Sequence, residues 1–128
     1  MRLLLDTHIF LWWTSGAPQL SPKARRAIEN GDNECWFSIA SAWEMAIKSS
    51  LGKLVIEQPL ERFIAEQLSA NGFRLLGIDL RHTAAVMSLP WHHRDPFDRL
   101  LVVQAQIEGL TLVTSDKSLT AYGGALLD

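Results

Sequence analysis

The segment RLLLDTH, residues 2–8, predicts a strand that passes directly into a helix. The three consecutive leucines, Leu3 to Leu5, are typical of a short strand that is covered on both faces of a parallel sheet. Asp6 follows this strand, and residues 7–14 have the pattern of a first helix that ends before Ser15-Gly16. We therefore expect a fold in which buried strands alternate with helices.

The same alternation continues to the end of the chain. Further strands are predicted at residues 35–39, 73–78 and 110–114, with a short fifth strand at 125–127. Helices are predicted to start at Pro22, after a cap at Ser38 or Ser41, at Pro59, after Asp79 and at Pro96, and to end near Asn30, Ser50, Asn71, Met87 and Gly109. This order predicts an α/β fold, a three-layer α/β/α arrangement around a central parallel sheet of four to five strands.

Size and composition indicate one domain spanning residues 1–128. The chain is 48% hydrophobic, and its longest apolar run, Ile9 to Trp13, is far shorter than the roughly 20 residues that cross a bilayer. No signal peptide is readable near the N-terminus, and Cys35 has no second cysteine with which to form a disulfide. We therefore expect a cytoplasmic protein with no membrane segment.

Charge and motifs exclude several classes of function. Twelve basic against 14 acidic residues give a net charge of −2, which disfavours binding of nucleic acid by bulk positive charge. The sequence has no Gly-rich dinucleotide fingerprint, no Walker loop and no G-x-S-x-G nucleophile elbow. Chemistry by a nucleotide cofactor or a serine nucleophile is therefore not indicated.

Acidic residues stand where a parallel sheet places its functional groups. Asp6 directly follows the first strand, Asp116 follows the fourth, and Glu44 and Asp98 lie on helices that start at the same edge. Each of these acids also has a purely structural explanation. They are, in chain order, a helix cap (Asp6), the second half of a capping box (Glu44), a first-turn acid (Asp98) and a turn residue (Asp116). Converging carboxylates repel one another unless cations neutralise them, and four oxygen ligands suit Mg²⁺ or Mn²⁺. Such a set is typical of in-line displacement at phosphorus.

Four segments together resemble the PIN-domain ribonucleases, and within them the VapC-type toxins of bacterial toxin–antitoxin pairs. These segments are LLLDTH with Leu11-Trp12, Ser38 through Trp43-Glu44 to Lys48 and Gly52-Lys53-Leu54, HRDPFDRL at 93–100, and LVTSD at 112–116. The resemblance implies Mg²⁺-dependent endonucleolytic cleavage of RNA, with Asp6, Glu44, Asp98 and Asp116 as catalytic and metal-binding residues. It also implies a homodimer that is blocked by a cognate antitoxin protein. Many relatives carry Asn near the fourth acidic position, so Asp116 departs from the pattern.

Other side chains are expected to support this site. We predict substrate contacts from Thr7, Lys48, Arg94, Arg99, Thr114 and Ser115. Lys48, one turn after Glu44, forms either a positioning pair with it or an ordinary surface pair. Arg94, Arg99 and Lys117 flank the acids, as a phosphate-binding patch or as solvated charges.

Histidines and aromatic residues offer further candidates. His92-His93 is interpreted as loop with an RNA contact, and Asp95 as a helix cap outside the site. Phe10, Trp12 and Trp13 are expected in the core and at the antitoxin contact, and Trp36 and Trp43 in the core or near the site.

Two alternative functions remain open on the sequence. A phospho-receiver signalling module shares a parallel sheet with acids at strand ends, but it needs two neighbouring acids where this chain has Asp6-Thr7-His8. It would also leave Glu44 and Asp98 without a role. A catalytically silent PIN scaffold that binds RNA or protein would retain the same residues.

Overall fold

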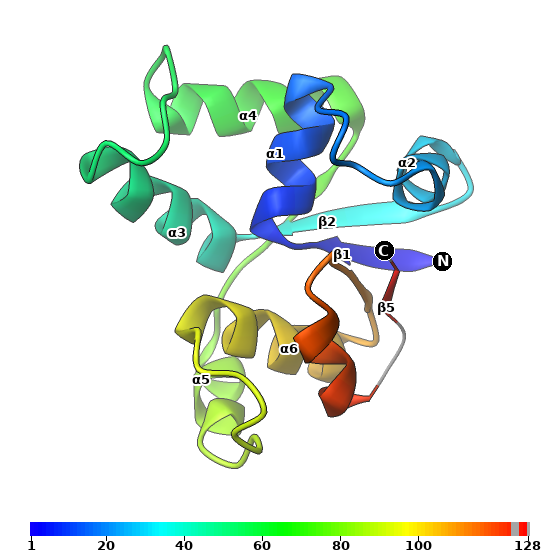
Figure 1. Cartoon of the computed structure of the whole chain (residues 1–128), viewed down its shortest axis with the longest axis vertical. Helices are drawn as coiled ribbons and strands as arrows, with labels where there is room; N and C mark the ends of the chain where they lie inside the picture. The colour runs from blue at the N-terminus through cyan, green and yellow to red at the C-terminus, as the bar shows by residue number, and fades with distance from the viewer. Residues whose placement is uncertain (124–125, 128) are drawn as a thin grey trace.

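The structure is a computed structural model that describes residues 1–123 and 126–127 (Figure 1). In chain order its elements are β1 Arg2–Leu5, α1 Thr7–Ser15, α2 Pro22–Glu29, β2 Glu34–Ser38, α3 Ile39–Ser50, α4 Leu60–Asn71, β3 Arg74–Leu76, α5 Leu80–Val86, α6 Pro96–Glu108, β4 Thr111–Val113, the 3-10 helix η1 Lys117–Tyr122, and β5 Leu126–Leu127. The predicted alternation of strands and helices is confirmed. The predicted fifth strand included Ala125, which lies outside the described residues.

The five strands form one parallel sheet in the order β3-β2-β1-β4-β5. The central strand is β1, in which Leu4 pairs with Trp36 of β2 on one side and with Leu112 of β4 on the other. The outer pairs β2–β3 and β4–β5 are also parallel. The chain thus builds the sheet outward from β1 in one direction, and then returns to its other side with β4.

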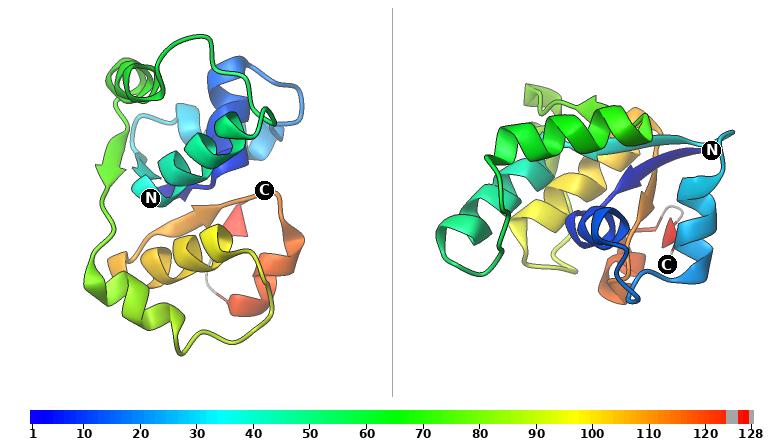
Figure 2. Two further views of the ribbon diagram at one scale, coloured as in Figure 1. Left: turned by 90° about the vertical axis from the view of Figure 1, so that its left-hand side faces the viewer. Right: turned by 90° about the horizontal axis from the view of Figure 1, so that it is seen from above.

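Helices cover both faces of the sheet and bury two separate cores. Successive side chains of β1 point to opposite faces, so Leu3 and Leu5 join the core beneath α1–α4, while Leu4 joins the core beneath α5 and α6. The two layers are separated clearly by the sheet in Figure 2. The predicted three-layer α/β/α architecture is confirmed.

Several helices begin at the carboxyl edge of the sheet because polar residues cap them there. The Asp6 carboxylate accepts a hydrogen bond from the backbone of Ile9 and starts α1. Of the two predicted caps for α3, the structure uses Ser38, whose hydroxyl accepts from Ala40 N. Asp95 caps α6, as expected. These caps bring the first turns of α1, α3 and α6 to one edge.

The prediction that Phe10, Trp12 and Trp13 belong to the core beneath α1–α4 is confirmed, whereas their antitoxin contact stays a prediction. Phe10 is fully buried against Phe37, Trp12 and Trp13 are half-buried beside this core, and Cys35 is buried, which raises the pKa of its thiol to about 11. Among the described residues, no helix is long and apolar enough to cross a membrane.

Candidate active site

The candidate site lies where the strand order reverses, between the carboxyl ends of β1 and β4. Asp6 follows β1, and its backbone N–H donates to the carbonyl of Val113 at the end of β4, 3.1 Å away. Asp116 follows β4 and caps η1 through Ser118. Open parallel sheets bind ligands at such a switch point, because the loops diverge there and leave room.

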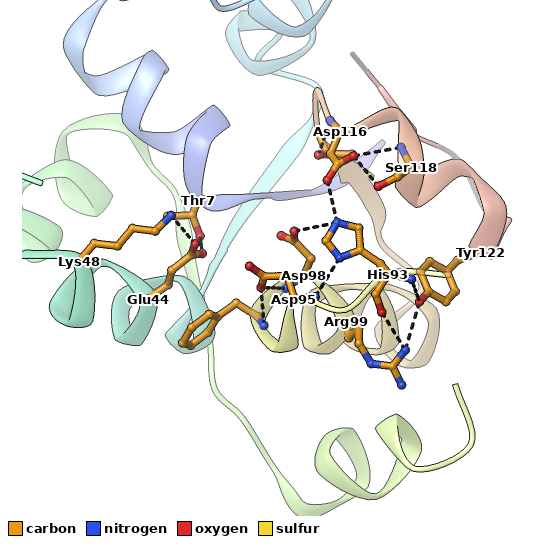
Figure 3. A network of polar contacts seen from close by, with 12 residues as sticks. Thr7, Glu44, Lys48, His93, Asp95, Asp98, Arg99, Asp116, Ser118 and Tyr122 are labelled. Atoms are coloured by element: carbon orange, nitrogen blue, oxygen red, sulfur yellow. Dashed lines mark hydrogen bonds and ion pairs between the residues drawn. The ribbon is translucent and has the colours of Figure 1, made fainter. Parts of the chain in front are cut away.

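Asp6 and Glu44 form the inner half of the site and are each only 5% exposed. The Thr7 hydroxyl donates to Glu44 Oε1 at 2.6 Å, and Lys48 Nζ lies 2.7 Å from Glu44 Oε2 (Figure 3). The structure therefore favours the positioning interpretation of Lys48, since it orients a nearly buried carboxylate. Glu44 is held from both sides before any ligand arrives.

Burial raises the pKa of Asp6 above its ordinary value, because the charged form loses hydration. A hydrogen bond from Thr114 opposes this effect, and the negative charge of Glu44 adds to it. Asp6 and Glu44 are therefore close enough to repel each other.

Asp98 and Asp116 form the outer half of the site, with His93 between them (Figure 3). His93 Nε2 lies 2.9 Å from Asp116 Oδ2 and 3.5 Å from Asp98 Oδ2. One atom from each of these three residues lies within 4.8 Å of the others. The outer half is more open than the inner half, since the side chains of Asp98 and Asp116 are 23% and 40% exposed.

The two outer acids have opposite electrostatic environments. Burial, followed by the charges of Asp95 and Asp6, raises the pKa of Asp98 to about 7. Hydrogen bonds from Ser118 and His93 instead lower the pKa of Asp116. The charge of Glu44 also acts on Asp98, so Asp98 links the outer half to the inner half.

His93 is a loop residue, as predicted, and the structure also brings its ring between Asp98 and Asp116. The position of His93 depends on a loop that packs on the core beneath α5 and α6. Contacts of this kind join residues far apart in the sequence, so a local sequence pattern does not reveal them. One local signal exists: His93 lies two residues before the cap Asp95, and its Nδ1 accepts the Asp95 N–H at 3.0 Å.

Arg99 does not lie where a phosphate could reach it, and this part of the predicted basic patch is wrong. The side chain is 2% exposed and its guanidinium donates to the carbonyls of residues 86, 89, 90 and 93 and to the Tyr122 hydroxyl. It also stacks on Trp91, 3.7 Å from the ring centre. Arg99 faces away from the acid beside it because consecutive helical residues point about 100° apart. It secures the loop that carries His93.

Thr7 and Thr114 are also buried, each 3% exposed, so the prediction that they contact substrate is wrong as well. Their hydroxyl groups serve the acids: Thr7 donates to Glu44, and Thr114 accepts from the Asp116 N–H at 3.1 Å. The remaining predicted contacts, Arg94 and Ser115, are exposed.

Trp43 lies beside the site and not in the core. It is 57% exposed and packs edge-to-face on Phe97, with ring centres 5.1 Å apart. Each aromatic residue directly precedes an acid, Glu44 or Asp98, so the pair lies next to the cluster. Trp36 is half-buried over the second core, where its indole donates to Glu34.

The donor set fits a hard divalent cation. Asp6, Glu44 and Asp98 supply carboxylate oxygens in a partly desolvated site, where burial first, and then the neighbouring carboxylates, raise the pKa values of Asp6 and Asp98. Among the described residues, Lys48 and His93 are the basic groups within ion-pair distance of these acids, and Lys48 serves Glu44. Oxygen ligands of this kind suit Mg²⁺ or Mn²⁺.

Comparison with known proteins places this geometry in a family. The sequence profile of the PIN domain matches residues 3–125. The chain belongs to the PIN-domain family. It is 31% identical to Ribonuclease VapC22 of Mycobacterium tuberculosis over 121 residues, which are 94% of this chain and 91% of that relative. A second relative from the same organism, Ribonuclease VapC16, is 34% identical over 62 residues, 48% of this chain and 44% of that protein.

Solved structures share this PIN-domain fold. VapBC2 from Rickettsia felis, solved bound to a DNA fragment from the promoter, matches with a TM-score of 0.71 at 18% identity, covering 98% of this chain and 97% of the other. A toxin–antitoxin complex from Klebsiella pneumoniae matches with a TM-score of 0.64 at 18% identity, covering 98% and 96%. The family resemblance stated from the sequence is therefore confirmed.

Proposed function

We propose that this protein is a metal-dependent endoribonuclease that hydrolyses RNA phosphodiester bonds, with residues 1–128 acting as one PIN domain. The observation that carries the proposal is the convergence of Asp6, Glu44 and Asp98 at the switch point of the sheet, with Asp116 joined to them through His93. Support also comes from the relative named Ribonuclease VapC22, which covers nearly the whole chain.

The side chains divide the work between holding charge and moving a proton. Asp6, Glu44 and Asp98 would hold Mg²⁺ or Mn²⁺, with Asp116 as a fourth, outer ligand. When bound, the cation supplies a Lewis acid that activates water and neutralises charge developing on the phosphate. Lys48 orients the Glu44 carboxylate. Without the cation, burial raises the pKa of Asp98 to about 7, so binding of the cation at this carboxylate would release a proton near neutral pH.

The direct test is cleavage of defined RNAs by the purified protein, with and without Mg²⁺. We expect cleavage that EDTA abolishes, and its loss in Glu44→Gln. Glu57→Gln is the matched control, because Glu57 is exposed and lies in the loop before α4. RNA binding without cleavage under all conditions would instead indicate the catalytically silent scaffold, and full cleavage in EDTA would exclude the metal mechanism.

We further propose that the protein is a cytoplasmic toxin neutralised by an antitoxin, which docks on a groove beside α1. The groove has a volume of about 410 Å³, and its apolar lining includes Leu11, Leu54, Val55 and Phe63. Val55 is 84% exposed, and a large exposed apolar surface is typical of a protein interface. The similarity of the fold to chains in solved toxin–antitoxin complexes supports this kind of partner.

Growth measurements test the toxin proposal. Expression of the chain alone should arrest growth, and co-expression of its cognate antitoxin should relieve the arrest. Val55→Asp should remain toxic but escape neutralisation, because a charge would be buried in the interface. Harmless expression of a protein that cleaves RNA in vitro would contradict the toxin assignment and leave the nuclease proposal standing.

We also propose that the protein is a homodimer. A second groove of about 350 Å³ lies between α3 and α4, lined mainly by apolar residues that include Ile39, Ile64 and Leu68. Sedimentation equilibrium should give twice the chain mass of 14.4 kDa, and Ile64→Glu should give a monomer. A monomeric wild-type protein at micromolar concentration would contradict the proposal.

A further inference from the structure

The backbone and ring of His93 are held at four points. Its N–H donates to the Tyr122 hydroxyl at 2.9 Å, and its carbonyl accepts from Arg99 at 3.3 Å. On the ring, Nδ1 accepts the Asp95 N–H, and Nε2 meets Asp116. Every polar atom of His93 therefore has a partner, and the ring has one orientation.

These contacts determine which ring nitrogen carries the hydrogen. A nitrogen that accepts a backbone N–H uses its lone pair, so Nδ1 carries no hydrogen. The ring hydrogen therefore lies on Nε2, directed at Asp116 Oδ2 at 2.9 Å and near Asp98 Oδ2 at 3.5 Å. An Nε2 that carries hydrogen has no lone pair to offer a metal ion. The cluster of His93, Asp98 and Asp116 is thus not a three-ligand metal site.

We infer that His93 is a positioning residue that holds the two outer carboxylates together through its Nε2–H and stays outside the ligand set. The effect of His93 on the rate of RNA cleavage rests on the proposed nuclease function. Without this hydrogen bond, Asp116 retains its contacts with Ser118 but loses its link toward Asp98. The ligand set stays entirely oxygen, which favours Mg²⁺ or Mn²⁺ over zinc.

Two substitutions separate this role from simple support of the loop. In His93→Gln the amide nitrogen can stand near the position of Nε2 and keep a donor for the carboxylates. In His93→Asn the short side chain can accept the Asp95 N–H, as Nδ1 does, but it cannot reach Asp116. Gln19→Asn is the control for a shortened polar side chain, because Gln19 is exposed in the turn between α1 and α2.

We expect His93→Asn to lower kcat about 10–100-fold with little change in KM, as for other residues that orient metal ligands. His93→Gln should retain most of the activity, and all variants should melt as the wild type does. Equal activity of the Asn and Gln variants, whether both high or both low, would overturn the inference. So would a higher rate for Asn than for Gln.

A spectroscopic measurement tests the same inference without any RNA cleavage. Long-range ¹⁵N–¹H correlation spectra of the wild-type protein should show His93 with hydrogen on Nε2 alone, both in EDTA and in Mg²⁺. Addition of Zn²⁺ should not shift the Nε2 resonance as direct ligation does. Hydrogen on Nδ1, or ligation through Nε2, would overturn the inference. If the wild type cleaves no RNA, the nuclease proposal fails, while this readout still decides the role of His93.

Discussion

The two halves of the acid cluster are built in different ways. Asp6 and Glu44 come from the end of the central strand and from a helix packed against it, and both are 5% exposed. Asp98 and Asp116 are half-exposed, and a histidine on a loop connects them. Regular elements hold the inner half in place, whereas the outer half depends on a loop secured by one buried arginine. The inner half should therefore be rigid and the outer half adjustable.

Loss of an inner acid should have the largest effect on catalysis. Asp6→Asn should lower kcat by about 10²–10⁴-fold, the range expected when a group essential to proton transfer or metal binding is lost. Asn remains a good helix cap, so α1 should still form. Asp116→Asn should lose less, because Asp116 is more exposed and already bonded to Ser118. Single-turnover rates at saturating Mg²⁺ measure both, with Asp32→Asn as control.

Equal losses in Asp6→Asn and Asp116→Asn would remove the distinction between a rigid and an adjustable half. A folded, active Asp6→Asn would exclude Asp6 from the site altogether.

Weakening the contacts that hold the His93 loop should lower the free energy of unfolding more than any surface substitution does. Arg99→Lys keeps the charge but cannot reach all of the carbonyls that the guanidinium serves, so buried acceptors lose partners. We expect a loss of about 2–4 kcal/mol in the free energy of unfolding, measured by urea denaturation. The fraction of the variant that stays folded should also be less active than the wild type, because the His93 carbonyl is one of those acceptors. A change within about 0.5 kcal/mol, as for a surface residue, would contradict the buried role.

Asp98, in the outer half, should make the metal-free protein less stable as pH rises. Asp98 has a pKa of about 7 in the folded protein, above its ordinary value of 3.8, so the folded state binds more protons than the unfolded chain between these values. The contribution of Asp98 to stability is therefore greatest below about pH 4 and is lost as pH rises through 7.

Thermal melts in EDTA between pH 4.5 and 8 measure this effect. Asp98→Asn should flatten the pH dependence, melt several degrees above the wild type at pH 8, and gain less from Mg²⁺. For the wild type, a hundredfold excess of Mg²⁺ over Kd adds about 2.7 kcal/mol. A variant that melts below the metal-free wild type at pH 8, and gains as much from Mg²⁺, would show that Asp98 serves only the helix start.

The smallest effect should come from the exposed arginine of the same segment. Arg94→Gln should leave stability within about 0.5 kcal/mol of the wild type. If Arg94 meets a phosphate, the slope of log K against log salt for RNA binding should fall by about 1. Titrations at several salt concentrations, with Arg62→Gln on α4 as control, measure it. An unchanged slope would mean that Arg94 is an ordinary solvated charge.

The features that the sequence could predict are those formed by residues close together in the chain. The strand at Leu3–Leu5, the caps Asp6 and Asp95, and the pair of Glu44 with Lys48 are local patterns, and the structure has all of them. Arg99 and Thr7 were misassigned because burial depends on segments far along the chain: Arg99 meets Tyr122, and Thr7 meets Glu44. The place of the His93 ring beside Asp116 could not be predicted for the same reason, since Asp116 follows another strand.

The position of β1 has a consequence for the order in which a newly made chain becomes active. It is the earliest of the five strands to leave the ribosome, yet Leu3 pairs with Thr111, far along the chain. Such distant pairings form slowly and late. A growing chain already contains Asp6, Glu44 and Asp98 while the strand that receives the Asp6 N–H is still missing. A nascent chain that has not yet received β4 therefore carries most of the acids but lacks the strand that completes the sheet edge beside Asp6.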